Sequence, residues 1–424
     1  MLDTLRNAWR IEDLRKKIVF TLIMLLVYRI GAFIPVPFID ASHIKSLVGE
    51  GNLLGLLDII TGGAFANYTI FAMGITPYIN SSIIMQLLTV AIPKLEQLSK
   101  EGEEGQKKIT QYTRYLTIGL AFVQSIGITY GLANQAGGQI MKYNSAWVYF
   151  VVALTLTAGT AFLMWLGEQI TEKGIGNGIS MIIFASIVSR IPVAAVSLWN
   201  LAFEVGTISP WSLPFIVIFI VALIAGVVFI DMGQRRIPVQ YAKRVVGRKV
   251  YGGQSTHIPL KVNSSGVLPI IFAVSLLSLP QTIGYFFPDS GFYRFIEAHF
   301  SQSSAAYAVT YALLIVFFTF FYSQISFNPI EVANNLKQYG GFVQGIRPGK
   351  PTSDYLLRIS NRITLVGSLF LAAVAIIPIA VASITKIPMY LQGTSILILV
   401  SVALETSKQL EAQMVMRHYK GFLK

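Results

Sequence analysis

Cysteine is absent from the sequence, and histidine is nearly so, with four copies scattered over 424 residues. The lack of cysteine excludes disulfides, thiolate catalysis and metal sites with cysteine ligands. The wide spacing of the histidines argues against a histidine metal cluster. We therefore expect a protein that works without a metal ion or another cofactor.

Charged residues are also scarce, at 12% of the chain against 54% hydrophobic residues. Soluble proteins carry charge on about a quarter of their residues, so this composition indicates a protein whose solvent is the bilayer. Acidic residues are the rarer kind, which leaves a formal charge of +13. The excess basic groups face either anionic lipid headgroups or an anionic partner such as RNA or an acidic protein, and composition does not choose between them.

Long uncharged runs supply the membrane spans, since a spanning helix needs about 20 mostly apolar residues. Ten stretches fit, and they cover residues 18–38, 69–93, 115–136, 147–167, 176–195, 213–230, 267–287, 305–328, 363–385 and 387–404. The first run follows a polar, basic stretch ending at Lys17 and is long enough to span. We expect it to stay as an anchor and not to be removed as a signal peptide.

The positions of Lys and Arg orient these spans. Of the 33 basic residues, 27 lie in the two tails and in the loops after the second, fourth, sixth and eighth spans. The opposite side holds single residues, among them Arg190 at the far end of the fifth span. Because cytoplasmic loops hold the excess of basic residues, both termini are expected in the cytoplasm.

The ten spans divide into two groups of five. We expect a cytoplasmic amino-terminal tail (1–17), a first five-helix half (18–195), a second half (196–409) and a cytoplasmic carboxy-terminal tail (410–424). Channels and transporters often place their pathway between two such halves, although the residues of the halves do not align visibly. The expected fold is an all-α polytopic membrane protein, with ten transmembrane helices in two pseudo-symmetric halves around a central pore.

A short amphiphilic piece, residues 53–60, separates the first two spans and is followed by Thr61, Gly62 and Gly63. It is too short to cross a bilayer. A re-entrant half-helix is allowed only where protein or water surrounds it, because unpaired backbone groups in lipid cost several kcal/mol each. An interfacial amphipathic turn on the outer face is the alternative, and the residues do not decide between the two.

Two cytoplasmic loops, 231–262 and 329–362, are longer than the connection of neighbouring helices requires. In the first, the alternation of Ile237, Val239 and Tyr241 predicts a short strand. In the second, Arg347 and Lys350 lie in a turn sequence rich in Pro and Gly. The basic residues of the first loop cluster around the strand, at Arg235, Arg236, Lys243, Arg244, Arg248 and Lys249. One or two basic residues would suffice to orient a helix, so these clusters favour a surface on which a partner docks.

Ionisable residues are almost missing from the spans, whereas ion and solute transporters keep paired ionisable groups at mid-membrane. Arg29 in the first span is the strong exception, and it lies near enough to the span end to snorkel or to pair with backbone carbonyls. No phosphate-binding loop and no nucleophile with a base and an orienting acid can be assembled. These absences argue against an enzyme and against a solute transporter. Any energy source must therefore come from a partner or from a gradient.

Eight motifs in order closely resemble the SecY family of bacterial translocation channels, and the match covers nearly the whole chain. They are YRIG (28–31), GITPYI (74–79), QYTRY (111–115), WLGEQITEKGIGNG (165–178), GQRR (233–236), YAKR (241–244), QSTHIPLKVN (254–263) and GIRPG (345–349). The sequence departs from the family at Gln344, where proline is common.

The resemblance implies an hourglass pore between the halves, closed by a ring of aliphatic side chains and plugged from outside by residues 53–66. The ring positions are Ile75, Ile79, Ile179, Ile183, Ile271 and Ile398. The plug residues are Leu53, Leu56, Leu57, Ile59, Ile60, Gly62 and Gly63. From the residues alone, each isoleucine would be read as ordinary core or lipid-facing packing.

The resemblance also implies a lateral gate, formed by the second and third spans against the seventh and eighth. Gln86 and Gln124 are polar residues in gate spans, placed either to hydrogen-bond across the closed seam or to pack against water. The basic loops become docking sites for the ribosome or for the SecA motor ATPase. Further implied partners are the small subunits SecE and SecG, signal peptides, precursor polypeptides and membrane lipids, and the implied location is the bacterial inner membrane.

Overall fold

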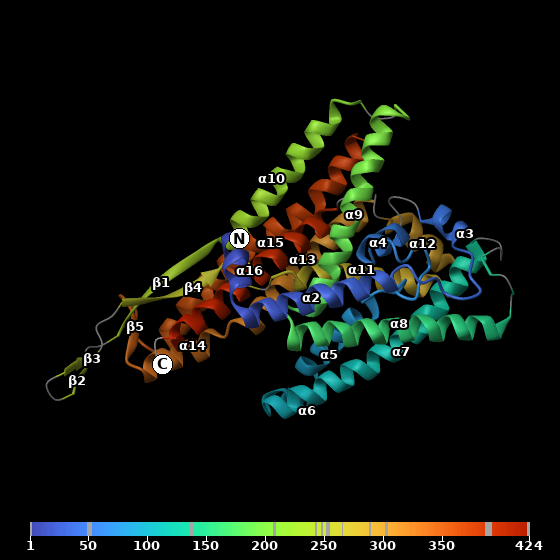
Figure 1. Ribbon diagram of the computed structural model, residues 1–424. Coiled ribbons are helices and arrows are strands. Elements are labelled where there is room, and N and C mark those ends of the chain that lie inside the picture. Colours follow the sequence, from blue (N-terminus) through green and yellow to red (C-terminus); the bar gives the residue numbers. More distant parts are fainter. Residues whose placement is uncertain are drawn as a thin grey trace.

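The structure is a computed structural model of the 424-residue chain (Figure 1). It describes residues 2–48, 53–135, 140–141, 143, 145–206, 209–241, 244–246, 249–251, 255–264, 266–287, 290–301, 304–385 and 392–421. Helices make up most of this part of the chain, and a small sheet extends from one end of the helical body (Figure 1).

Helices of the first half carry the first five predicted spans. They are α1 (Leu2–Arg10), α2 (Glu12–Gly31), α3 (Ala41–Leu47), α4 (Leu53–Ile60), α5 (Thr76–Ala91), α6 (Pro93–Lys100), α7 (Glu103–Gln135), α8 (Ala146–Lys173) and α9 (Gly178–Phe203). The predicted spans fall on α2, α5, α7, α8 and α9.

The second half contains the remaining five spans and the strands. Its elements are α10 (Ser212–Met232), β1 (Gln234–Tyr241), β2 (Arg244–Val246), β3 (Lys249–Tyr251), β4 (Ser255–Lys261), α11 (Leu268–Gly284), α12 (Gly291–His299), α13 (Ala305–Ser326), α14 (Pro329–Gln338), β5 (Gly341–Val343), α15 (Lys350–Thr385) and α16 (Gly393–Gly421). The predicted spans fall on α10, α11, α13, α15 and α16.

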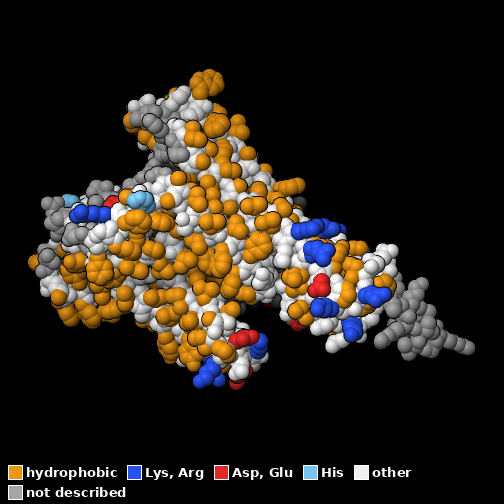
Figure 2. Space-filling view, turned by 180° about the vertical axis from the view of Figure 1, so that it is seen from behind, with side chains coloured by type: hydrophobic (Ala, Val, Ile, Leu, Met, Phe, Trp, Pro, Cys, Tyr) orange, Lys and Arg blue, Asp and Glu red, His pale blue; other side chains and the backbone are white. Residues whose placement is uncertain are grey.

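Length and composition alone qualify six helical runs in the described part of the chain to cross a membrane. These are α7, α8, α9, α10, the run that starts with α13, and α15, while α11 is a shorter apolar helix. Hydrophobic side chains cover most of the face in Figure 2, and Lys and Arg gather at the end that bears the sheet. The surface is therefore that of a helical polytopic membrane protein.

Several helix ends differ from the expected span limits. The first span was expected to reach residue 38, but α2 ends at Gly31, ahead of Pro35 and Pro37, which cannot continue a helix hydrogen-bond ladder. The second was expected from residue 69, but α5 begins at Thr76 with Pro77 in its first turn. Proline is favourable there because the first helical N–H groups have no intrahelical acceptor.

Two helices outrun their predicted spans. α15 begins at Lys350, well before the expected start at residue 363, and its first turns lie beside the sheet. α9 continues past Pro192 as far as Phe203. The proline removes one hydrogen bond without ending the helix, because residues on both sides keep helical geometry. The last span was expected to start at residue 387, and residues 386–391 lie outside the described part of the chain.

Helices of each half pack mainly with one another. In the first half, α7 and α8 pair along their length, and α8 also contacts α2 and α9. In the second half, α13 packs against α11 and α15, and α16 packs against α10 and α15. The two sets meet where α11 contacts α5 and α7, and where α16 contacts α9.

The turn between α8 and α9 is packed too tightly for side chains at its glycines. A Cβ atom on Gly178 would lie 1.9 Å from the carbonyl oxygen of Gly167, and Gly176 has a φ of +82°. The turn is anchored to α2, since the Ile175 N–H donates to Thr21 Oγ1 at 3.1 Å. These contacts explain why the sequence places glycine at alternate positions here, and they fix the first turn of α9.

The strand expected at 237–241 is present as part of β1. β1 pairs antiparallel with β4 on one edge and with β5 on the other. Its inward residues Ile237 and Val239 join Leu336 of α14 and Leu356 of α15 in one buried cluster. β2 and β3 form a separate antiparallel hairpin. The alternating apolar residues therefore attach the sheet to the helical body.

Candidate functional site

A small cavity lies where α5, α9, α11 and α16 converge. Four of the six predicted ring residues line it, one from each helix: Ile79, Ile183, Ile271 and Ile398. Each of these side chains is at most 9% exposed. The cavity volume is about 40 Å³, which is space for a few water molecules but not for a peptide chain.

The other two predicted ring residues do not line the cavity: Ile75 belongs to the same buried cluster, and Ile179 is partly buried and packs against that cluster. Ile75 is 4% exposed and precedes the first turn of α5. Ile179 lies in the first turn of α9, where its side chain packs close to Gly167 of α8. The tight turn between these helices therefore directs Ile179 toward α8, although it shares a helix face with Ile183.

The 53–66 segment closes one side of this cavity. Leu57, Ile59 and Ile60 line the cavity together with the four isoleucines. Leu54 is also buried, and α4 packs against α9. The segment thus lies inside the protein and not on its surface, as the re-entrant alternative requires. The side chains of Leu53 and Leu56 lie outside the described residues.

Gly62 and Gly63 allow the chain after α4 to turn against α9. Both have positive φ, +66° and +91°. A Cβ on Gly62 would lie 3.0 Å from the Cα of Ser186, a backbone atom that cannot yield. Glycine is therefore required at Gly62 by both its conformation and its close approach to the helix.

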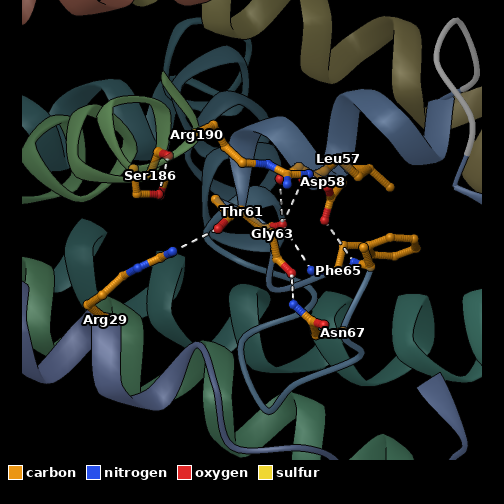
Figure 3. A network of polar contacts seen from close by, with 12 residues as sticks. Arg29, Leu57, Asp58, Thr61, Gly63, Phe65, Asn67, Ser186 and Arg190 are labelled. Atoms are coloured by element: carbon orange, nitrogen blue, oxygen red, sulfur yellow. Dashed lines mark hydrogen bonds and ion pairs between the residues drawn. The ribbon is translucent and has the colours of Figure 1, made fainter. Parts of the chain in front are cut away.

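An ion pair joins the segment to α9 (Figure 3). The carboxylate of Asp58 contacts the guanidinium of Arg190, and its other oxygen accepts a 2.8 Å hydrogen bond from the Ala66 N–H. The side chain of Asp58 is 2% exposed and that of Arg190 is 30% exposed. The burial of Asp58 is tolerated because both of its oxygens have partners.

Two residues of the YRIG motif hold the same segment from the side of α2. Arg29 Nη1 donates to the Gly62 carbonyl at 2.8 Å (Figure 3), and its guanidinium lies 4.9 Å from the centroid of the Phe33 ring. The Tyr28 hydroxyl donates to the Thr61 carbonyl at 3.0 Å and lies 2.6 Å from Ser186 Oγ. Arg29 thus pairs with a backbone carbonyl, one of its two expected roles.

Sequence reasoning missed the Asp58–Arg190 pair. It treated Arg190 as a lone charge at a span end, whereas α9 continues for three further turns beyond it. It also took Arg29 as the single strong charge within the spans, and Arg190 is a second. The available signal was Asp58 itself, an acidic residue within the otherwise apolar run of α4.

The contact of α5 and α7 with α11 and α13 is here called the seam, and the two predicted gate glutamines lie on α5 and α7. Gln86 Oε1 on α5 accepts a hydrogen bond from the Tyr322 hydroxyl on α13, across the seam. Gln124 is 7% exposed on α7. Gln86 therefore hydrogen-bonds across the seam to a tyrosine, whereas Gln124 is buried without a hydrogen bond to α11 or α13 among the described residues.

The predicted docking residues lie at the end that carries the sheet. Arg235 and Arg236 are exposed on β1, and Arg347 and Lys350 are exposed at the turn that leads into α15. The Arg347 carbonyl accepts a 2.8 Å bond from Thr352 Oγ1, which orders this turn. Lys243 and Arg248 lie outside the described residues, as do the side chains of Arg244 and Lys249 on the hairpin.

Within the described ranges, no group of three His, Asp or Glu side chains is placed to hold a metal ion. The candidate site consists of three parts: an apolar cavity, the 53–66 segment that closes one side of the cavity, and the seam between two sets of helices.

Comparisons with known proteins agree on one family. The SecY family model matches residues 69–407. The chain is 48% identical to protein translocase subunit SecY of Bacillus subtilis and 49% identical to that of Halalkalibacterium halodurans, each over the full length of both proteins.

Solved structures share the fold. A structure described as that of a protein conducting channel matches with a TM-score of 0.68 at 21% identity, covering 95% of this chain and 93% of the other. Sec61 in the canine ribosome–channel complex matches with a TM-score of 0.64 at 19% identity, covering 95% and 93%. The family model and the full-length relatives together show that the chain belongs to the SecY family.

Proposed function

We propose that this chain is the channel-forming subunit of a protein translocase, and that unfolded polypeptides cross the membrane between Ile79, Ile183, Ile271 and Ile398. The observation that carries the proposal is their convergence, from four helices of both halves, on one cavity that the 53–66 segment closes. The names of the full-length relatives support it, since they are protein translocase subunits.

An apolar constriction suits a substrate of arbitrary sequence. It holds water and ions poorly, so it resists leakage at rest. Its aliphatic side chains can yield around a polypeptide without selecting a particular one. Because Leu57, Ile59 and Ile60 share the cavity with the ring, a translocating chain requires α4 to move away. The 53–66 segment is accordingly the plug in this proposal.

The seam is the proposed lateral exit, through which hydrophobic segments enter the bilayer. It lies between helices of the two halves, and among the described residues Gln86 hydrogen-bonds to Tyr322 across it. Helices joined mainly by apolar packing separate at little cost when lipid or a hydrophobic segment takes the place of the partner.

Partners supply the energy in this proposal. The exposed Arg235, Arg236, Arg347 and Lys350 form a basic surface for the ribosome or for the SecA motor, and phosphate contacts need basic groups without base reading. Two solved relatives are ribosome-bound, the canine Sec61 complex and the yeast Ssh1 complex. We place the chain in the bacterial inner membrane with cytoplasmic termini, together with SecE and SecG.

The experiment is a measurement of ion conductance through the resting channel in planar bilayers. Replacement of Ile79, Ile183 and Ile271 by Ser removes the apolar seal and is expected to raise conductance. Ile315→Ser is the control, because Ile315 is fully buried on α13 but does not line the cavity. Conductance that stays at the level of this control contradicts the proposed constriction.

A further inference from the structure

Two glycines of α7 contact the end of α11, in the part of the seam that lies away from the basic loops. Gly127 and Gly131 are one helical turn apart, and both face the end of α11. A Cβ on Gly127 would lie 2.1 Å from the ring of Phe286. A Cβ on Gly131 would lie 2.7 Å from Tyr285 Cδ1 and 2.8 Å from Tyr285 Cβ. Small residues at such spacing let two membrane helices approach closely.

The two contacts differ in how easily they give way. Phe286 is partly exposed and meets Gly127 with the far edge of its ring, which can swing aside. Tyr285 is 6% exposed and meets Gly131 with its Cβ and its backbone oxygen, the latter at 3.0 Å. A side chain at Gly131 can therefore be accommodated only if α7 moves away from the end of α11.

Further contacts join α7 to α12 and to the end of α11 next to Gly131. One turn beyond Gly131, Gln135 Nε2 donates to the Tyr293 hydroxyl on α12 at 2.7 Å. Burial, with a smaller effect of the nearby Glu297 carboxylate, raises the pKa of Tyr293, so this hydroxyl stays neutral. Ile128 and Leu132 lie in one buried cluster with Tyr285, and that cluster also contains Leu57 of α4. Separation of α7 from α11 thus disturbs a buried cluster to which Leu57 of the 53–66 segment also belongs.

We infer that the contact of Gly131 with Tyr285 is a specificity-determining contact, which sets how hydrophobic a segment must be to open the seam. The inference rests on the proposed lateral exit. A segment that enters the seam replaces this packing with its own, so its apolar surface must offset the loss. A side chain at position 131 raises the free energy of the closed seam and lowers the hydrophobicity that a segment needs.

Gly119 provides a matched control on the same helix. It is exposed, and a Cβ there would meet nothing within 4 Å. Gly119→Ala and Gly131→Ala make the same chemical change and raise the helix propensity of α7 equally. Gly127→Ala is expected to fall between them, because the Phe286 ring can move.

The test measures transport into vesicles of a precursor series in which leucines of the signal segment are replaced stepwise by alanine. For a marginal precursor, Gly131→Ala is expected to increase transport by about tenfold over wild type, since overpacking of this size shifts an equilibrium by roughly that factor. Gly119→Ala should match wild type. A hydrophobicity threshold that is the same in Gly131→Ala and Gly119→Ala overturns the inference.

A second measurement reports the separation of α7 from α12, next to the Gly131 contact. Because the sequence has no cysteine, the pair Gln135→Cys and Tyr293→Cys can be joined by a short thiol crosslinker without background. The crosslinking yield is expected to fall in the Gly131→Ala background and to persist with Gly119→Ala, and an equal yield in both overturns the inference.

The transport measurements separate failure of the inference from failure of the proposed lateral exit. If wild type transports every precursor regardless of hydrophobicity, the lateral exit fails and the inference with it. If wild type shows a threshold that Gly131→Ala leaves unmoved, only the inference fails.

Discussion

Asp58 on α4 and Arg190 on α9 form an ion pair that fastens the 53–66 segment beside the cavity (Figure 3). The carboxylate is almost fully buried, whereas the guanidinium is partly exposed. Replacement of only one residue of such a pair is destabilising, because the remaining buried charge then has no partner. The pair therefore favours the arrangement in which the segment closes the cavity.

Loss of either charge is expected to loosen the segment. Asp58→Asn and Arg190→Gln should each raise the resting ion conductance, with a cost to the closed state of up to about 3 kcal/mol given the partial exposure of Arg190. Arg294→Gln is the control, since Arg294 is exposed on α12. The double variant should leak less than the sum of the two single variants. Strictly additive leaks would show that the two residues act independently.

The Tyr28 hydroxyl contributes a weaker hold on the same segment. Tyr28→Phe removes its bonds to the Thr61 carbonyl and to Ser186 but keeps the ring stacked on Phe71. The closed state should lose about 1 kcal/mol, which gives a conductance between wild type and Asp58→Asn. The same bilayer recording measures it. A leak as large as that of Asp58→Asn would contradict this ranking.

Tyr322 and Tyr311 of α13 allow a paired test of the seam. Tyr322→Phe leaves Gln86 Oε1 without its donor, so the closed seam should lose about 1 to 2 kcal/mol. The Tyr311 hydroxyl is buried without a hydrogen-bond partner among the described residues, so Tyr311→Phe should be neutral or stabilising. Insertion of a weakly hydrophobic segment into lipid should increase in the first variant alone. Equal insertion in both would argue against the hydrogen bond.

The sequence predicted the helices well because each span is an apolar run of the length that a bilayer requires. It predicted helix ends less well, since proline ends α2 yet begins α5. The sequence did not predict contacts between residues that are far apart in the chain. No local pattern pairs Asp58 with Arg190 or Gly131 with Tyr285, and the spacing of Ile179 and Ile183 gave no sign that a tight turn directs Ile179 toward Gly167.

Arg347 is expected to contribute to the docking of the ribosome or SecA and not to the closure of the resting pore. Arg347→Glu reverses an exposed charge that does not line the cavity, so it should abolish transport of a secretory precursor into vesicles while the resting conductance stays unchanged. Arg10→Glu is the control, because Arg10 is also exposed but lies on α1. Near-normal transport by Arg347→Glu would contradict the docking role.

Crosslinking of a stalled precursor to the predicted ring tests the proposed pathway most directly. A photoreactive residue is placed in turn at Ile75, Ile79, Ile179, Ile183, Ile271 and Ile398, with the exposed Ile218 of α10 as the control. The four positions that line the cavity, Ile79, Ile183, Ile271 and Ile398, should form adducts with the precursor, and Ile218 should form none. Adducts that are absent from these four positions, or equally strong at Ile218, would contradict a pathway through the isoleucine ring.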